Sequence, residues 1–253
     1  MFGEEIKQLS NSAEDKYRRS REGFLSYMMS AAVAGFFIFV ATILSNIASA
    51  MLMDVSPAAA KLAGAFLFSI AIILIVFIGG ELFTGNNMTM AVGVYTGKVS
   101  LRQAGMVWLL SYIGNFLGIL FLCLLFCFSG AQNALLTGYY TAVIPGKLGL
   151  TAAEYFLRGV LCNFLVCLAV FTGVRMKSES GKILVMSCVI ASFVLAGFEH
   201  CIANMSTFTL GALFLGGLPW AEAAKSMLLV TLGNMVGGGI VMSFPVWFIS
   251  KET

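Results

Sequence analysis

One long apolar run begins near Ile183, continues past Gly216, and is interrupted by the sequence Gly197-Phe-Glu-His200. A transmembrane helix needs about 20 apolar residues, so the interruption would place Glu199 and His200, the only histidine of the chain, at membrane depth. Ionisable groups are costly there, and they are usually buried in protein or line a functional cavity. The alternative is a plain loop between two short spans, with a surface histidine.

Composition places most of the chain in a lipid bilayer. Of the 253 residues, 59% are hydrophobic and 11% are charged, whereas soluble domains carry about 25% charged residues. We therefore predict an all-α membrane protein with six transmembrane helices, two of them broken. The predicted spans cover residues 24–51, 57–95 with a break at 79–87, 104–128, 151–174, 183–215 with a break at 197–205, and 220–248.

The remaining segments are short and polar. Residues 1–22 are predicted to be an amphipathic cytoplasmic segment, helical at the membrane surface, and residues 251–253 a cytoplasmic tail. No signal peptide is expected, because the charged N-terminus is not followed by a short apolar segment with a cleavage site. Residues 129–150 contain glycines and Pro145 and are predicted to be a loop. Residues 23–250 form the predicted channel domain.

Positive charge predicts the orientation. With six spans both termini lie on one side, and most of the basic residues fall on that side, which identifies it as the cytoplasm. The basic residues there are Lys7, Lys16, Arg18, Arg19, Arg21, Lys98, Arg102, Arg175, Lys177, Lys182 and Lys251. The four others, predicted to lie on the outer side, are Lys61, Lys147, Arg158 and Lys225.

The two broken spans indicate an internal repeat. The first break contains Gly79-Gly-Glu-Leu-Phe-Thr-Gly-Asn-Asn87, and the second contains Gly197-Phe-Glu-His-Cys-Ile-Ala-Asn204. Gly114-Asn115 and Gly233-Asn234 recur in the spans that follow, at nearly the same offset. Two halves of three spans, about 23–128 and 151–250, must have opposite topology. Inverted repeats with paired broken helices are typical of transporters and channels.

Breaking a helix in lipid frees backbone groups that protein or water must satisfy. We expect Asn86, Asn87 and Asn204 to cap the freed helix ends. For Glu81 and Glu199 the favoured interpretation is structural: each carboxylate accepts hydrogen bonds from backbone N–H groups of its own loop. The alternative is that they line the path. The half-helices after the breaks start near the centre, and their N-termini favour an anion there.

Three other side chains are candidates for direct contact with a permeating species. His200 occurs only in the second break and can donate or accept a proton near neutral pH. Thr84, in the opposite break, is placed to hydrogen-bond this species or the histidine. Lys147 precedes the fourth span, and it is either an ordinary loop lysine or an electrostatic lure for anions.

These motifs resemble the formate/nitrite transporter family. The resemblance rests on Gly80-Glu-Leu-Phe-Thr-Gly-Asn86, on Gly197-Phe-Glu-His200 with Ala203-Asn-Met205, on Asn163-Phe-Leu-Val-Cys-Leu-Ala169 and on Gly233-Asn234. It covers all six spans. The length, the charged N-terminus and the cysteine in the second break are similar to the bacterial hydrosulfide channel branch.

The resemblance implies an aquaporin-like fold, assembled as a homopentamer in the bacterial inner membrane, with one pore per protomer. It implies formate, nitrite or hydrosulfide as substrates, and it maps the central histidine, loop threonine and vestibule lysine onto His200, Thr84 and Lys147. Asn163 and Asn234 are further candidates for the substrate pathway. It also implies two apolar constrictions, a cytoplasmic one at Phe68, Ile72 and Phe193 and an outer one at Leu82, Phe83 and Val166.

We therefore predict a channel or transporter for small monovalent anions rather than an enzyme or a nucleic-acid-binding protein. His200 and Thr84 would hydrogen-bond the anion between the two constrictions, with anion conduction and anion–proton cotransport both open. One alternative is an aquaporin-like pore for neutral solutes, against which the absence of paired Asn-Pro-Ala motifs argues. The other is a membrane enzyme or redox protein. With one histidine and no Cys–His cluster, we expect neither a cofactor nor a metal site.

Overall fold

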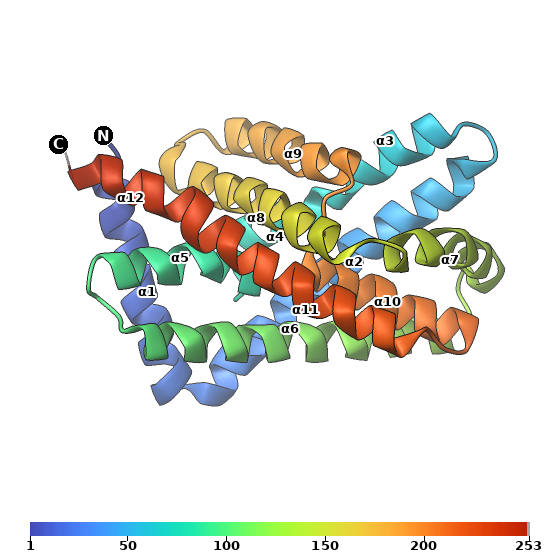
Figure 1. Ribbon diagram of the computed structural model, residues 1–253, viewed down its shortest axis with the longest axis horizontal. Coiled ribbons are helices and arrows are strands. Elements are labelled where there is room, and N and C mark those ends of the chain that lie inside the picture. The colour runs from blue at the N-terminus through green and yellow to red at the C-terminus, as the bar shows by residue number, and fades with distance from the viewer. Residues whose placement is uncertain (252–253) are drawn as a thin grey trace.

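The computed structural model describes residues 1–251, and the regular elements in that range are all helices (Figure 1). Six helical segments are long and apolar enough to cross a bilayer, which confirms the predicted number of spans. Two residues of the predicted tail, 252 and 253, lie outside the described range. The helices are α1 Gly3–Glu22, α2 Phe24–Met53, α3 Pro57–Phe68, α4 Ile70–Phe77, α5 Phe83–Tyr95, α6 Leu101–Phe128, α7 Asn133–Leu148, α8 Ala152–Arg175, α9 Glu179–Ala196, α10 Cys201–Leu215, α11 Trp220–Val236, the π-helix η1 Gly237–Met242 and α12 Ser243–Lys251.

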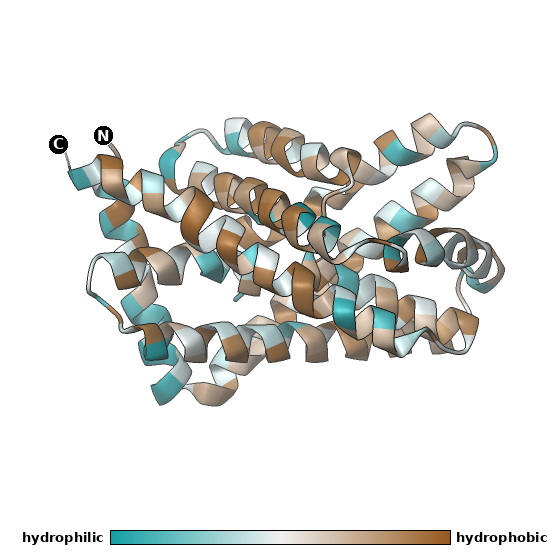
Figure 2. Ribbon diagram, in the orientation of Figure 1, coloured by the Kyte–Doolittle hydropathy of each residue, from teal (hydrophilic) through white to brown (hydrophobic). Residues whose placement is uncertain are grey.

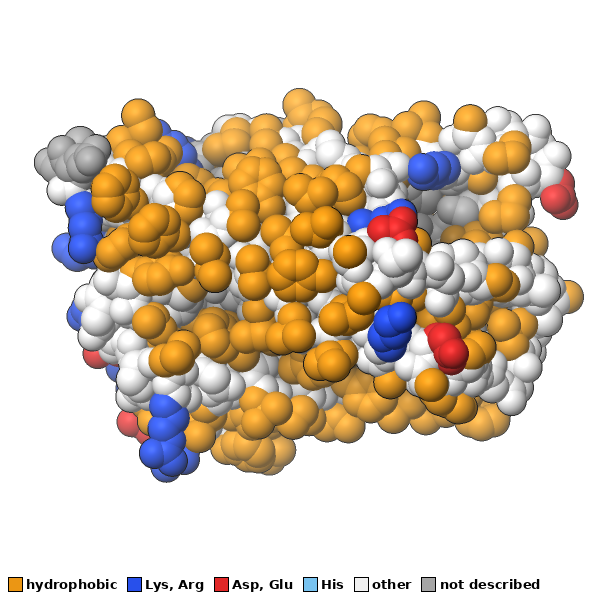
Figure 3. Space-filling view, viewed as in Figure 1, with side chains coloured by type: hydrophobic (Ala, Val, Ile, Leu, Met, Phe, Trp, Pro, Cys, Tyr) orange, Lys and Arg blue, Asp and Glu red, His pale blue; other side chains and the backbone are white. Residues whose placement is uncertain are grey.

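The spans run roughly along the long axis of the molecule, with both termini at one end and α7 at the other (Figure 1). We call these the terminal end and the α7 end. Hydrophobic residues predominate along the helices between them (Figure 2). On the face seen in Figure 3 the charged side chains lie toward the two ends, and the surface between them is mainly hydrophobic. This distribution suits a protein whose middle faces lipid and whose ends face water.

Two predicted segments differ from the structure. Residues 133–148 form helix α7 instead of a loop. Leu136, Tyr140 and Ile144 recur every fourth residue and are buried, so one face of this helix packs against the spans. Pro145 lies in the last turn, where it ends the helix rather than preventing it. The first break is also shorter than predicted, because α5 already begins at Phe83.

The sixth span contains a π-helical turn, η1, that the sequence analysis did not predict. A π-turn leaves carbonyl groups outside the regular helical pattern. Two of them are satisfied by hydroxyl groups: the Ser243 Oγ donates to the Gly238 carbonyl at 2.6 Å, and the Tyr95 hydroxyl donates to the Gly239 carbonyl at 2.8 Å. The second bond ties α5 to the sixth span.

One asparagine holds each break. Asn115 on α6 donates to the carbonyls of Ala31 at 2.8 Å and Glu81 at 2.9 Å, and its Oδ1 accepts the Phe83 N–H at 3.0 Å. Its side chain therefore satisfies a carbonyl inside the break and the N–H that begins α5, which lipid could not do. A Cβ on the preceding Gly114 would come within 2.4 Å of Ala31 Cβ, so the small residue is required for α6 to approach α2.

Asn234 on α11 repeats this arrangement at the second break. It donates to the carbonyls of Gly159 at 2.8 Å and Glu199 at 2.9 Å, and its Oδ1 accepts the Cys201 N–H at 2.9 Å. Gly197 supplies the left-handed backbone, with φ of 75°, that ends α9. The two halves thus build their breaks with the same contacts. An aquaporin-like relation between the halves stays a prediction.

The asparagine contacts predict unequal effects of truncating two fully buried asparagines. We expect Asn234→Ala to destabilise the protein strongly, because each buried polar group left without a partner costs about 1–3 kcal/mol. Asn87→Ala is the matched control: Asn87 is also wholly buried, but neither of its side-chain polar atoms is hydrogen-bonded. Thermal unfolding of the detergent-solubilised variants checks this. Equal losses of stability would show that Asn234 contributes packing alone.

Candidate functional site

A cavity of about 620 Å³ opens at the α7 end of the molecule. Its wall includes hydroxyl and amide groups of α2 and four charged residues. Phe68, Phe193 and His200 also line it, and the two phenylalanine rings meet edge to face at 6.0 Å between centroids. The charged residues of the wall are Lys61, Lys147, Arg158 and Glu199. Because this wall contains polar groups and carries more positive than negative charge, it is suited to a hydrated anion.

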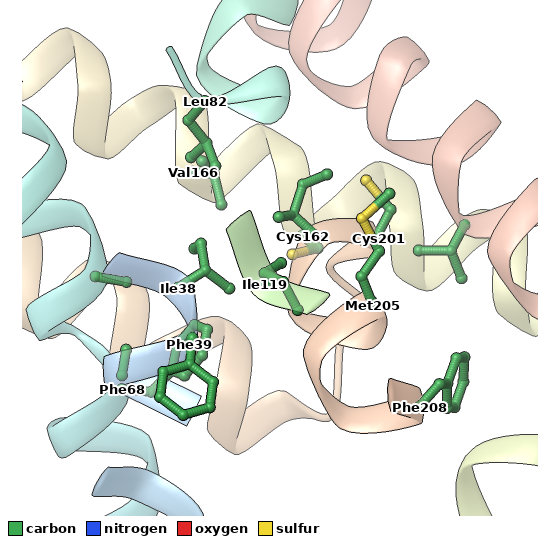
Figure 4. Close-up of a cluster of buried hydrophobic side chains, with 14 of the residues drawn as sticks. Ile38, Phe39, Phe68, Leu82, Ile119, Cys162, Val166, Cys201, Met205 and Phe208 are labelled. Carbon is green, nitrogen blue, oxygen red and sulfur yellow. The ribbon is translucent and has the colours of Figure 1, made fainter. Parts of the chain in front are cut away.

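A second, much smaller space of about 10 Å³ is lined by the same Phe68, Phe193 and His200. Its other walls are apolar and come from Ile38, Ala71, Ile72, Ile75, Leu82, Val166 and Ile190. In Figure 4, Leu82 and Val166 lie side by side. A space of this size holds about one water molecule. His200 therefore borders both the large cavity and a small, mainly apolar space.

Phe68 and Phe193 lie on the side opposite to the one predicted. Phe68 and Phe193, predicted on the side of the termini, line the cavity that also contains Lys147, at the α7 end. Ile72 lines only the smaller space, together with Leu82 and Val166. The sequence spacing located these residues near the breaks, but it could not show toward which end each side chain points.

Phe83 lines neither space. Its ring packs against Tyr112 with centroids 5.0 Å apart, and the side chain is buried. Its backbone N–H, bound by Asn115, is the part of the residue that supports the break. The structure also identifies residues that the sequence analysis missed, Ile38 and Ile190, which line the smaller space. In the sequence both residues look like the many other aliphatic residues of the apolar spans, so no sequence signal could have identified them.

His200 and Thr84 are in contact across the two halves. The Nε2 of His200 lies 2.9 Å from the Oγ1 of Thr84, and both residues are buried. The Nδ1 of His200 accepts the Ala203 N–H at 3.0 Å, which makes His200 the N-cap of α10. Because an Nδ1 that accepts a backbone N–H carries no proton, the neutral ring bears its proton on Nε2 and donates it to Thr84. The imidazole also stacks on Phe193 at 6.0 Å.

The two glutamates are held by cations, not by the backbone N–H groups of their own loops as predicted. The ammonium of Lys147 donates to both Glu199 oxygens, at 3.1 and 2.9 Å, and to Asn204 Oδ1 at 3.0 Å. Asn204 Nδ2 donates to Glu199 at 2.7 Å. Lys147 is thus neither an ordinary loop residue nor a free charge, since a buried carboxylate compensates it.

At the terminal end Glu81 has the corresponding partners. Lys16 and Arg19 of α1 lie 2.5 and 3.3 Å from its carboxylate, and Asn86 Nδ2 donates to it at 3.3 Å. Asn86 and Asn204 therefore bind carboxylates rather than cap helix ends, and the side-chain amide of Asn87 has no hydrogen-bond partner within residues 1–251. Buried charges are normally paired in this way.

Asn163 and Asn234, predicted in the substrate pathway, line neither of the two spaces. The Nδ2 of Asn163 donates to the carbonyls of Thr84 at 3.2 Å and Asn234 at 2.7 Å. Its contacts brace α5 against α11 and fix the backbone beside Thr84. Both asparagines thus stabilise the backbone around the site without lining either space.

Comparison with known proteins identifies the family. A solved structure described as an FNT family ion channel superposes with a TM-score of 0.89 at 29% identity, covering 96% of this chain and 98% of that one. A second, described as a pentameric formate channel with formate bound, has a TM-score of 0.77 at 28% identity, covering 91% and 98%. The nitrite transporter NirC of Salmonella typhimurium is 30% identical over all of this chain and 94% of its own length. The family model described as formate/nitrite transporter matches residues 3–248, and the chain therefore belongs to that family.

Proposed function

We propose that this protein carries small monovalent anions, formate, nitrite or hydrosulfide, across the bacterial inner membrane. The observation that carries the proposal is the position of His200, which lines both the larger cavity and the small apolar space and contacts Thr84. Formate and nitrite are supported by the names of the relatives. Hydrosulfide is proposed on the sequence resemblance. The alternative is a pore for neutral solutes, which the cationic cavity disfavours.

The first step is entry of the hydrated anion into the cavity at the α7 end. There α2 offers hydroxyl and amide groups from Thr42, Ser45, Asn46 and Ser49. The anion then sheds water to pass Phe68 and Phe193 and meets His200. The N-termini of α5 and α10 point into the protein from the two breaks, and they favour negative charge there. The apolar space beyond is costly for a full charge, so it excludes hydrated metal ions.

We further propose that His200 lends a proton to the anion. In the neutral ring the Nε2 proton is the only one, so transfer first requires a second proton on Nδ1, which a hydronium ion in the cavity that His200 lines supplies, leaving water. That proton displaces the hydrogen bond from the Ala203 N–H. The imidazolium then passes its Nε2 proton to the anion, which leaves as the neutral acid, while the ring keeps the Nδ1 proton. A neutral acid crosses the apolar space beside Leu82 and Val166 far more readily than an anion.

We propose a homopentamer with a pore in each protomer, because a structural neighbour is described as a pentameric channel. We also propose that the terminal end is cytoplasmic, because most basic residues lie there.

The anion proposal predicts selective flux. Reconstituted in liposomes as a pentamer verified by native mass measurement, the protein should pass formate, nitrite or hydrosulfide but not glycerol. Leu82→Trp should abolish this flux by filling the apolar space, whereas Leu125→Trp, on an exposed face of α6, should leave it unchanged. Stopped-flow measurements of internal anion concentration check both variants. Glycerol flux without anion flux would support the neutral-solute pore.

Proton lending by His200 predicts a loss of pH dependence in His200→Asn. Asparagine is also a good N-cap and can accept the Ala203 N–H, so the variant should assemble normally, yet it cannot titrate. In the parent, anion uptake with its proton should rise as the external pH falls, because protonated His200 becomes more frequent. We expect the variant to lose this rise. The measurement is anion and proton flux together across a pH series. A matching profile would mean that the anion acquires its proton in the cavity and that His200 is structural.

The proposed orientation predicts one-sided labelling. A cysteine at Lys251 should react with a membrane-impermeant maleimide only from the cytoplasm. A cysteine at Ala134, exposed on α7, should react only from outside. The parent, with its native cysteines, is the control. Outward labelling at Lys251 would reverse the proposed direction of entry.

A further inference from the structure

The wall of the cavity at the α7 end carries more positive charge than is needed to compensate its one carboxylate. Lys61, Lys147 and Arg158 line it together with a single carboxylate, that of Glu199. That carboxylate accepts two hydrogen bonds from Lys147, at 2.9 and 3.1 Å, and one from Asn204 at 2.7 Å. Glu199 is nearly buried, with 6% of its side chain exposed, so the pair is fixed in the wall. The net positive charge of the cavity therefore comes from Lys61 and Arg158.

Lys61 is the least engaged of these cations. It lies on α3, is exposed, and makes no ion pair or hydrogen bond with any residue between 1 and 251. An unpaired ammonium at the edge of a cavity keeps its full charge available, within the screening of the solution. It acts on an approaching anion as a point charge without preferred direction.

Arg158 on α8 is only partly engaged. One of its guanidinium nitrogens lies 3.2 Å from Glu154 Oε1, in an ion pair that is 36% and 44% exposed and therefore weak. The other oxygen of Glu154 is used at the N-terminus of α8, where it accepts from Thr151 N and Oγ1, each at 2.8 Å. The remaining N–H donors of Arg158 have no partner among residues 1–251. A guanidinium presents paired donors that match a planar oxyanion.

We propose that Lys61 and Arg158 form an entry subsite that captures planar monovalent oxyanions before they reach His200. The inference rests on the proposed anion transport and adds where the anion is first held and which anions are favoured. Lys61 raises the local concentration of any anion. Arg158 selects carboxylate-like and nitrite-like ions over spherical ones, because only a planar oxyanion uses its paired donors. Lys147 has the separate task of holding the second break through Glu199.

The test uses the reconstituted full-length protein and the variants Lys61→Gln, Arg158→Gln and their combination. At low ionic strength we expect the formate concentration for half-maximal influx to rise about threefold in each single variant and about tenfold in the double variant. The maximal rate should stay unchanged, and the increases should shrink at high ionic strength. Lys225→Gln is the matched control: Lys225 is exposed on α11 but does not line the cavity.

Arg158→Lys tests the selectivity, because it keeps the charge and removes the planar donor pair. We expect half-maximal influx of formate to require about twofold more anion, a smaller rise than in Arg158→Gln because the charge is kept, with hydrosulfide influx unchanged. If the parent passes no anion, the proposed function fails and the entry subsite with it. A second outcome would overturn the entry subsite alone. The parent would pass formate, but at low ionic strength the double variant would need the same formate concentration for half-maximal influx as Lys225→Gln. Equal effects of Arg158→Lys on both anions would overturn its selectivity.

Discussion

The structure depends on satisfying the backbone groups that two broken helices leave at membrane depth. Water is absent from the hydrocarbon region, so every freed N–H and C=O must be met by protein. Asn115 and Asn234 do this with one side chain at each break, by donating to two carbonyls and accepting one N–H. The glycine before each asparagine lets the supporting helix come close enough. Everything at the centre, including His200 and Thr84, is positioned by these contacts.

Some cations of the protein compensate buried carboxylates, and others are proposed to attract the transported anion. The deeply placed carboxylates, Glu81 and Glu199, are compensated by cations of α1 and α7, the helices that lie at the two ends. Compensation removes the repulsion that a bare carboxylate would exert on an anion. The charge left for an anion lies farther out, on side chains with weak or no partners. Lys147, which the sequence suggested could attract anions, therefore forms an ion pair with Glu199 in the structure and holds the second break.

In the proposed mechanism His200 combines two opposing roles, capping a helix and donating a proton. As the N-cap of α10 its Nδ1 must accept a hydrogen bond, which favours the neutral ring. As a proton donor to an anion it must first give that bond up. The cost of breaking the cap keeps the ring neutral when no anion is present, and an adjacent negative charge offsets part of that cost. Protonation is thereby linked to occupancy by the geometry of the break itself.

The sequence by itself determined the six spans, the two breaks and the residue types at their centre, because apolar length, glycine and ionisable residues are local signals of lipid burial. It predicted His200 and Thr84 as candidates in opposite breaks, and the structure places their side chains 2.9 Å apart, while their part in transport stays a prediction. It missed helix α7, since its glycines and Pro145 concealed a buried face. It also assigned Phe68 and Phe193 to the wrong end and gave Glu199 the wrong partners. Those properties were decided only by the tertiary structure, because the direction of a side chain and the partner of a charge depend on helices distant in the chain.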